Sequence, residues 1–340
     1  MKNSKIQMLC RILLVSILVS SCSNEFDSAV QNENQKIFIH GEDIFVSKGI
    51  VNFRSINSYR DLIENSDFSK KTIIVKSIDE VQNYTSMKNQ YFTSKSSSNS
   101  RRLHSLEEEM VVTNDFFTTL LNADGMLTIG DYIIKINLGE GICMVLPKKH
   151  EDQIDDLKAE DTSNENILVF SVSDDVLDML EAGSSGTING RTSLFCGDRR
   201  ADGKEKIKDE EYSDGTAEVD YQVKAKHVYQ EAAVYFSLLT ELKHMSRFQS
   251  AGSLTPWSQS STEIYVEYYF KWKQRCRDGN TEDRGSKETL WDNKLNYRPY
   301  ERTRGLARIQ IESRYIYLQR NVNTGGVDKQ LSVPTIIDGY

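Results

Sequence analysis

Apolar and polar residues alternate along much of the C-terminal part of the chain, with the period of two that is typical of β-strands. In residues 262–273 (TEIYVEYYFKWK) one face of the predicted strand is apolar. Its members are Ile264, Val266, Tyr268, Phe270 and Trp272. The same alternation runs through residues 219–229, 233–245 and 306–321, although a helix is an alternative for 233–245. A phase slip near Ser313 predicts a β-bulge. Strands with one apolar face each predict a mainly antiparallel, sandwich-like β-domain.

The N-terminal half mixes helical and strand periods. Apolar residues at helical spacing predict helices over residues 57–68, 77–92 and 106–122. Short β-rich runs predict two strands within residues 36–46, a three-strand meander over 126–147 and a further strand at 166–173. Residues 174–183 (DDVLDMLEAG) begin with aspartates and end at a glycine, as a capped helix does. This pattern predicts an α+β domain.

Polar, Gly- and Ser-rich runs divide the chain. We expect a flexible tether at residues 22–35, a loop at 93–102 and an interdomain linker at 184–195. The predicted domains are therefore an α+β domain over residues 36–183 and a β-domain over 196–340.

The first 21 residues predict an export signal. Lys2, Lys5 and Arg11 precede a short apolar core at residues 12–19, which falls well below the roughly 20 residues that a membrane-spanning helix needs. The sequence Leu-Val-Ser-Ser-Cys that ends at Cys22 resembles the lipobox of bacterial lipoproteins, whose cysteine carries lipid and becomes the mature N-terminus. An ordinary signal peptide with a chance cysteine is the alternative.

Two further segments extend this resemblance. The segments FFTTLLNADGMLTIGDYIIKIN and VKAKHVYQEAAVYFSLLTELKH, taken with the lipobox, resemble uncharacterised lipoproteins of Bacteroides-type gut bacteria. The resemblance covers about half of the mature chain. It implies a lipid-anchored protein of the cell envelope, with the outer membrane or the cell surface as the expected location, and it brings no catalytic residues.

Composition narrows the possible partners. The chain has 340 residues, a net charge of −8 and 38% hydrophobic residues, which is typical of a core-forming protein. Nucleic-acid binding needs clustered Lys and Arg, so this charge argues against such a partner. Of the five cysteines, Cys196 and Cys276 each precede a charged turn and are the predicted disulfide pair, whereas Cys143 lies in an apolar run and is expected to be reduced.

No motif for metal, cofactor or catalysis is complete. Residues 185–193 lack the first glycine and the lysine of a phosphate-binding loop. Residues 198–209 resemble a calcium loop, but Arg200 occupies a ligand position and would repel the ion. The five histidines are scattered without metal-ligand spacing. We therefore expect no catalytic residues, no cofactor and no metal.

Two classes of function remain. The first is a non-catalytic binding or structural module of the envelope, with a glycan or a protein as its ligand. Alternation places Tyr265 and Tyr269 on the outward face of the 262–273 strand, where they are candidate ligand-binding residues. The second is an exported, glycosidase-like hydrolase whose carboxylates come from acidic runs such as 150–161, although sequence cannot show which of them converge.

Overall fold

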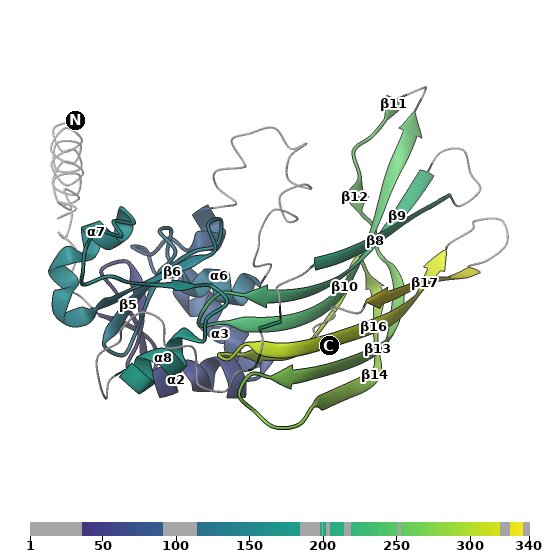
Figure 1. The fold of residues 1–340 in the computed structure, drawn as a ribbon. Helices are drawn as coiled ribbons and strands as arrows, with labels where there is room; N and C mark the ends of the chain where they lie inside the picture. Colours follow the sequence, from purple (N-terminus) through teal and green to yellow (C-terminus); the bar gives the residue numbers. More distant parts are fainter. Residues whose placement is uncertain are drawn as a thin grey trace, which may run out of the picture. The chain divides into compact units, whose positions relative to one another are not determined.

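The computed structural model describes residues 36–90, 114–183, 198, 200–201, 205–213, 219–250, 253–319 and 327–335. Residues Ile37–Tyr340 form one compact unit. Within it, helices around one sheet are followed by two mostly antiparallel sheets (Figure 1). The predicted order, an α+β region before a mainly antiparallel β region, is confirmed. The linker predicted at residues 184–195 lies outside the described residues, so the domain boundary stays a prediction.

The N-terminal region is built on a sheet of seven described strands whose order follows the chain. They are β1 (Ile37–His40), β2 (Ile44–Ser47), β3 (Ile50–Phe53), β4 (Met126–Ile129), β5 (Tyr132–Asn137), β6 (Ile142–Pro147) and β7 (Leu168–Ser171). Neighbouring strands are antiparallel except β3 and β4, which run parallel. The predicted strands and the 126–147 meander are confirmed. Strand β3 was not predicted, because its four residues are all buried and do not alternate.

Short helices flank this sheet. They are α2 (Ile56–Arg60), the π-helix η1 (Asp61–Asn65), α3 (Phe68–Asp79), α6 (Asp115–Leu120), the 3₁₀ helix η2 (Lys148–Gln153), α7 (Ile154–Lys158) and α8 (Val176–Gly183). The helix predicted over 77–92 is interrupted, because residues 80–86 are not helical although 87–90 are. Helix α3 starts at the Asp67 cap, whose side chain accepts a hydrogen bond from the Lys70 N–H, and it ends at Asp79. Ile78, Val81 and Tyr84 are all buried, so apolar side chains continue inward through a turn and imitate a longer helix.

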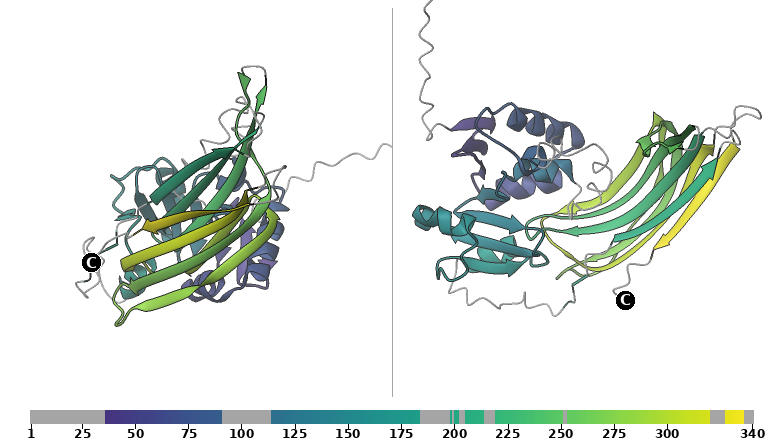
Figure 2. Two further views of the ribbon diagram at one scale, coloured as in Figure 1. Left: turned by 90° about the vertical axis from the view of Figure 1, so that its right-hand side faces the viewer. Right: turned by 90° about the horizontal axis from the view of Figure 1, so that it is seen from above.

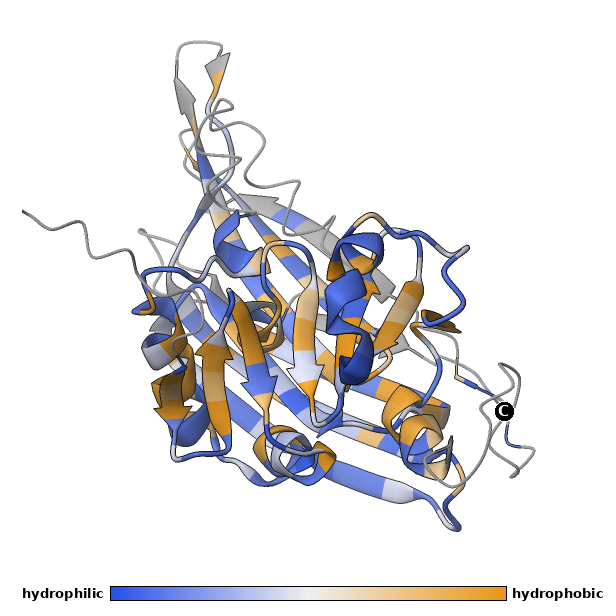
Figure 3. Cartoon of the chain, turned by 90° about the vertical axis from the view of Figure 1, so that its left-hand side faces the viewer, coloured by the Kyte–Doolittle hydropathy of each residue, from blue (hydrophilic) through white to orange (hydrophobic). Residues whose placement is uncertain are grey.

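Both faces of the seven-stranded sheet are covered. A large apolar cluster joins one face to α2, η1, α3, α6 and α8, and a smaller one joins the other face to α7. Figure 3 shows the long hydrophobic stretches on these strands and helices. Burial of this kind supplies most of the stability of short helices, because isolated helices of five to twelve residues are marginal in water.

The C-terminal region consists of two sheets. Their strands are β8 (Glu205–Ser213), β9 (Val219–Glu231), β10 (Phe236–Ser250), β11 (Ser253–Leu254), β12 (Ser258–Gln259), β13 (Thr262–Gln274), β14 (Thr281–Asp292), β15 (Lys294–Arg302), β16 (Leu306–Gln319) and β17 (Val327–Thr335). In the described part of the chain, one sheet has the order β11-β10-β9-β8, with β12 and β15 also paired to β10. The other has the order β14-β13-β16-β17. The strand prediction for residues 233–245 is confirmed and the helical alternative is wrong.

Apolar side chains of the two sheets pack against each other. One shared cluster contains Tyr229, Phe236, Leu238, Phe270, Trp272, Tyr300, Leu306, Ile309 and Ile311. A second contains Val223, Ala225, Leu242, Ile264, Val266, Leu295, Tyr315 and Tyr317. Figure 2 shows the long strands of both sheets running side by side. The inward face predicted for β13 is confirmed, since Ile264, Val266, Phe270 and Trp272 are buried and Tyr268 packs with both clusters.

A layer of polar and tyrosine side chains separates these two clusters. Strand register aligns His227 with Thr240, Thr240 with Tyr297, and Tyr268 with Ser313. His227 Nε2 lies 2.6 Å from Ser313 Oγ, which joins the two sheets by a buried hydrogen bond. The bulge predicted near Ser313 is wrong, because the pairing of β16 with both neighbours is continuous there. Ser313 faces inward, and this polar residue at an inward position imitated a phase slip.

The hairpin between β9 and β10 enters the N-terminal core. Residues 232–235 belong to the large cluster of the seven-stranded sheet. The ring of Tyr235 stacks on that of Phe117, with centroids 4.4 Å apart. The N–H of Ala233 donates to Val172 O (2.6 Å), and Ala233 O accepts from the Val176 N–H (3.2 Å). The hairpin therefore packs as a part of the N-terminal region although its strands belong to the C-terminal sheet.

Candidate functional site

A buried group of charged side chains lies where α8 meets the turns of the C-terminal sheets. Ser173, Asp174 and Asp175 precede α8, and Asp178 lies in its first turn. The carboxylate of Asp174 accepts a hydrogen bond from the Ser171 N–H (2.8 Å), which fixes the turn before the helix. Acidic residues are favourable at a helix N-terminus, where backbone N–H groups carry partial positive charge. This local preference explains why the aspartates gather here.

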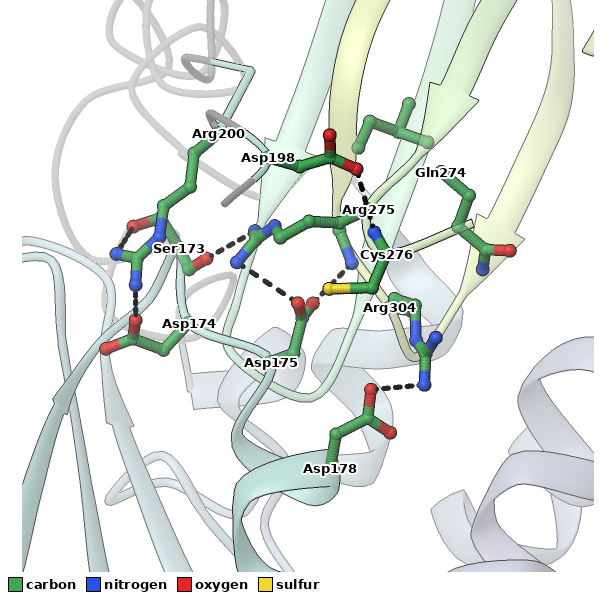
Figure 4. Close-up of polar contacts among 12 residues, drawn as sticks. Ser173, Asp174, Asp175, Asp178, Asp198, Arg200, Gln274, Arg275, Cys276 and Arg304 are labelled. Atoms are coloured by element: carbon green, nitrogen blue, oxygen red, sulfur yellow. Dashed lines mark hydrogen bonds and ion pairs between the residues drawn. The ribbon is translucent and has the colours of Figure 1, made fainter. Parts of the chain in front are cut away.

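Asp175 and Arg275 form the buried centre of this cluster (Figure 4). Their side chains are 0% and 4% exposed, and Arg275 Nη1 lies 3.1 Å from Asp175 Oδ2. The Gly305 N–H donates to Asp175 Oδ1 (2.6 Å), and Arg275 Nη2 donates to Ser173 O (2.8 Å). Burial raises the pKa of Asp175, against the opposing effects of Arg275 and the Gly305 N–H. A charge this deeply buried is tolerated only because its partner and hydrogen bonds are held in place.

Gly305 is required by this close approach. A Cβ at this position would lie 2.5 Å from Arg275 Nη2 and 3.3 Å from Asp175 Oδ1. A larger residue would therefore displace the Arg275 guanidinium that pairs with Asp175.

A second layer of ion pairs surrounds the centre. Asp178 pairs with Arg304 and with Arg60, each at 2.6 Å. Arg60 also donates to both carboxylate oxygens of Glu181 at 2.8 Å. Asp174 pairs with Arg200, as Figure 4 shows. The carboxylates before and within α8 are thus each matched by an arginine.

A third group holds the end of β13. The carboxylate of Asp198 accepts hydrogen bonds from Lys273 Nζ (2.8 and 3.0 Å) and from the Cys276 N–H (3.1 Å). The hydrogen bond from Lys273 lowers the pKa of Asp198. Cys276 is disulfide-bonded. Cys196, its predicted partner, lies outside the described residues, so the pairing stays a prediction.

A separate charged network lies beside the inserted hairpin. Glu301 of β15 accepts hydrogen bonds from Tyr235 Oη (2.7 Å) and Asn114 Nδ2 (2.8 Å), and it pairs with Lys71 of α3. Burial alone would raise the pKa of Glu301, but Lys71, Arg298 and the hydrogen bonds outweigh it and the pKa is lowered. This network also ties the C-terminal sheets to the N-terminal helices.

The chemistry open to these groups is limited by their pairing. Glycoside hydrolysis needs one carboxyl group that delivers a proton to substrate and a second that acts as base or nucleophile. Here Asp174, Asp175, Asp178 and Glu301 each face a cation, and Asp175 has no exposed surface. Their geometry is suited to holding the N-terminal region against the C-terminal sheets. Among the described residues, no group of three or more His, Cys, Asp or Glu side chains could hold a metal ion.

The sequence did not predict this cluster. The only local signal was the aspartate pair that begins residues 174–183. Arg275 and Gly305 lie more than 90 residues further along, and a buried ion pair across such a separation leaves no periodic pattern.

The two tyrosines predicted on the outward face of β13 are both half-buried. Tyr265 is paired with Glu288 and Ile316 on the neighbouring strands. The guanidinium of Arg284 lies 4.2 Å from the centroid of the Tyr269 ring. The structure therefore places both residues on one face, but a neighbouring side chain covers the ring of Tyr269.

The cysteines differ in state. In the described part of the chain Cys143 is free and buried, as the sequence predicts, and burial raises the pKa of its thiol. Cys22, the predicted lipidation site, lies outside the described residues. No described helix has the length and apolar character needed to cross a membrane.

Comparison with known proteins gives no relative. No family model matches the chain, and neither a curated protein nor a solved structure matches it.

Proposed function

We propose that this chain is a lipid-anchored lipoprotein of the bacterial envelope, exposed at the outer membrane or cell surface, that serves as a non-catalytic binding or structural module. The anchor rests on the lipobox ending at Cys22 and on the resemblance to Bacteroides-type lipoproteins. In this proposal the two C-terminal sheets act as one sandwich-like module that carries the ligand surface.

The observation that supports a non-catalytic role is that each carboxylate of the charged clusters is already paired with a cation. Asp175 is matched by Arg275, Asp178 by Arg304 and Arg60, and Glu301 by Lys71. A catalytic carboxyl group must reach its substrate and exchange a proton with it. Carboxylates that join two parts of the chain through buried ion pairs are suited to rigidity instead, and a rigid body is what a surface-displayed binding module requires.

The anchor is tested by the mature N-terminus in the native host. We expect mass spectrometry to find a protein that begins at Cys22 and carries acyl chains. Two or more chains give long-lived attachment, because each buried CH₂ contributes about 0.8 kcal/mol. The variant Cys22→Ala should leave the membrane fraction, whereas Cys143→Ala should remain in it. An unmodified mature protein, or membrane retention of Cys22→Ala, would contradict the proposal.

A further inference from the structure

Strands β14 and β15 follow each other in the chain but belong to different sheets. Among the described pairings, β14 is hydrogen-bonded to β13 and β15 to β10. Side chains of the two strands touch, but no ladder joins them in the described part of the chain. We call this unpaired line the seam. Figure 1 shows β14 at the edge of its sheet, beside β13.

Two tyrosines remain partly exposed at the seam although they point between the sheets. Their neighbours on the same faces, Phe270 of β13 and Tyr300 of β15, are 0% and 3% exposed. Tyr268 and Tyr297 are only half-buried. Their rings stack with centroids 4.2 Å apart and planes at 28°. The polar layer of the core therefore reaches solvent here.

The inward face of β14 is polar where it lines the seam. Register opposite β13 places Asp283, Gly285 and Lys287 on this face. The Tyr297 hydroxyl donates a hydrogen bond to Asp283, and Lys287 Nζ lies 5.4 Å from the centroid of the Tyr297 ring. A Cβ on Gly285 would lie 2.7 Å from the Tyr268 hydroxyl, so only glycine leaves room for that ring.

Thr289 continues this face and carries an unsatisfied group. Its Oγ1 is buried and has no hydrogen-bond partner in the described structure. Buried hydroxyls are normally paired, because desolvation without a partner is unfavourable. A ligand hydroxyl can pair with it only when the side chains over it move.

We propose that the seam cluster, formed by Tyr268, Asp283, Gly285, Lys287, Thr289 and Tyr297, binds a neutral oligosaccharide. This inference rests on the proposed function, because it names the class of ligand that the non-catalytic binding module would take. Partly exposed tyrosine rings pack against the apolar C–H face of a sugar, and their hydroxyls bond to its polar edge. The carboxylate of Asp283 accepts from sugar hydroxyls and the ammonium of Lys287 donates to them. The two charges cancel, so a charged ligand gains no net attraction.

The size of the cluster favours a sugar over a protein as the ligand. A stable protein interface buries about 800 Å² on each partner, far more than the six residues of the seam cluster supply. Lys287 is exposed and its flexible side chain lies over the Tyr297 ring, so its displacement opens that ring to a ligand.

The test uses the full chain in detergent and isothermal titration calorimetry with four neutral hexasaccharides: those of cellulose, xylan, amylose and chitin. We expect at least one to bind. Asp283→Asn removes the charge of the acceptor and Tyr297→Phe removes a hydroxyl, and each should weaken that binding about tenfold or more. Glu282→Gln, on the same strand but facing outward, is the matched control and should leave the affinity unchanged. Near-ultraviolet circular dichroism checks that each variant keeps its tertiary packing.

The outcomes separate this inference from the proposed function. No binding of any hexasaccharide at millimolar concentration would overturn the seam site. Loss of binding in Tyr265→Ala with Tyr269→Ala, and not in Asp283→Asn, would overturn it too, in favour of the outward face. Cleavage of a bound hexasaccharide would overturn the non-catalytic role, and retention of Cys22→Ala in the membrane would overturn the anchor.

Discussion

At the scale of single residues, the ion pair of Asp175 with Arg275 places two charges out of contact with water. Both side chains are almost fully buried, and each also has a backbone partner. Taking two charges out of water is costly, so the pair adds little net stability compared with a well-packed apolar pair. Removing only one partner is different, because the other is then left charged, buried and unmatched.

Arg275→Met tests this at the residue scale. We expect the free energy of unfolding, measured with urea, to fall by about 3–5 kcal/mol, because Asp175 loses its cation. Arg54→Met is the matched control, since Arg54 pairs with Glu42 on the surface with side chains 60% and 75% exposed. Its cost should stay within about 1 kcal/mol. Equal effects of the two substitutions would show that Asp175 is less isolated from water than its burial indicates.

At the scale of elements, the hairpin of β9 and β10 connects the two regions. Tyr235 stacks on Phe117 and donates its hydroxyl to Glu301. Tyr59 stands nearby and donates to Val234 O, at a longer 3.3 Å. Both tyrosines are 0% exposed, so they differ mainly in what their hydroxyls contact.

Tyr235→Phe should keep the ring stacking and remove the hydrogen bond to a charged acceptor. We expect thermal unfolding to show a loss of about 1.5–3 kcal/mol, the usual range for a bond to a charged group. Tyr59→Phe, which removes a weaker bond to a neutral carbonyl, should lose about 1 kcal/mol or less. A larger loss in Tyr59→Phe would show that the hydrogen bond to Val234 O holds the hairpin more strongly than the bond to Glu301.

Elements also show what the sequence could predict. Strand β13 was predictable because four of its inward residues are apolar and its outward residues are polar. Strand β14 (TEDRGSKETLWD) was not predicted, because at the edge of a sheet it has no apolar face. The polar residues that hid β14 are those that line the seam, so the candidate sugar site could not be found from an apolar pattern. The helix predicted over 77–92 was only partly right, because burial continues past the end of α3 at Asp79 through residues that form no helix.

At the scale of the whole molecule, stability couples to pH through Glu301. Its pKa is lowered in the folded state from an ordinary value of 4.5. The folded protein therefore keeps this group charged at a pH where the unfolded chain binds a proton. Its contribution is complete above the ordinary pKa and is lost as the pH falls through the lower folded value.

The variant Glu301→Gln should accordingly be less stable than the natural protein at pH 7, and the gap should narrow as the pH falls below about 4.5. Urea unfolding at several pH values measures this difference. A gap that stays constant down to pH 3 would show that Glu301 acts through its shape and not through its charge.

The disulfide of Cys276 is a covalent link within the molecule. Cys276 is disulfide-bonded, and its N–H donates to Asp198, only two residues beyond Cys196 in the chain. Two residues span at most about 7 Å, so the chain before Asp198 is short enough to return Cys196 toward Cys276. Cys196 is therefore the expected partner, and the bond would close a loop of about 80 residues.

Peptide mapping without reduction should recover a peptide that joins Cys196 to Cys276. Closing a loop of this length lowers the entropy of the unfolded chain, so Cys196→Ser should reduce the free energy of unfolding by roughly 4 kcal/mol. Cys143→Ser, which alters a free thiol, leaves the cross-link intact. Reductant should destabilise this control and the natural protein equally, and should not destabilise Cys196→Ser further. A mapped peptide that joins Cys276 to any other cysteine would contradict the assignment.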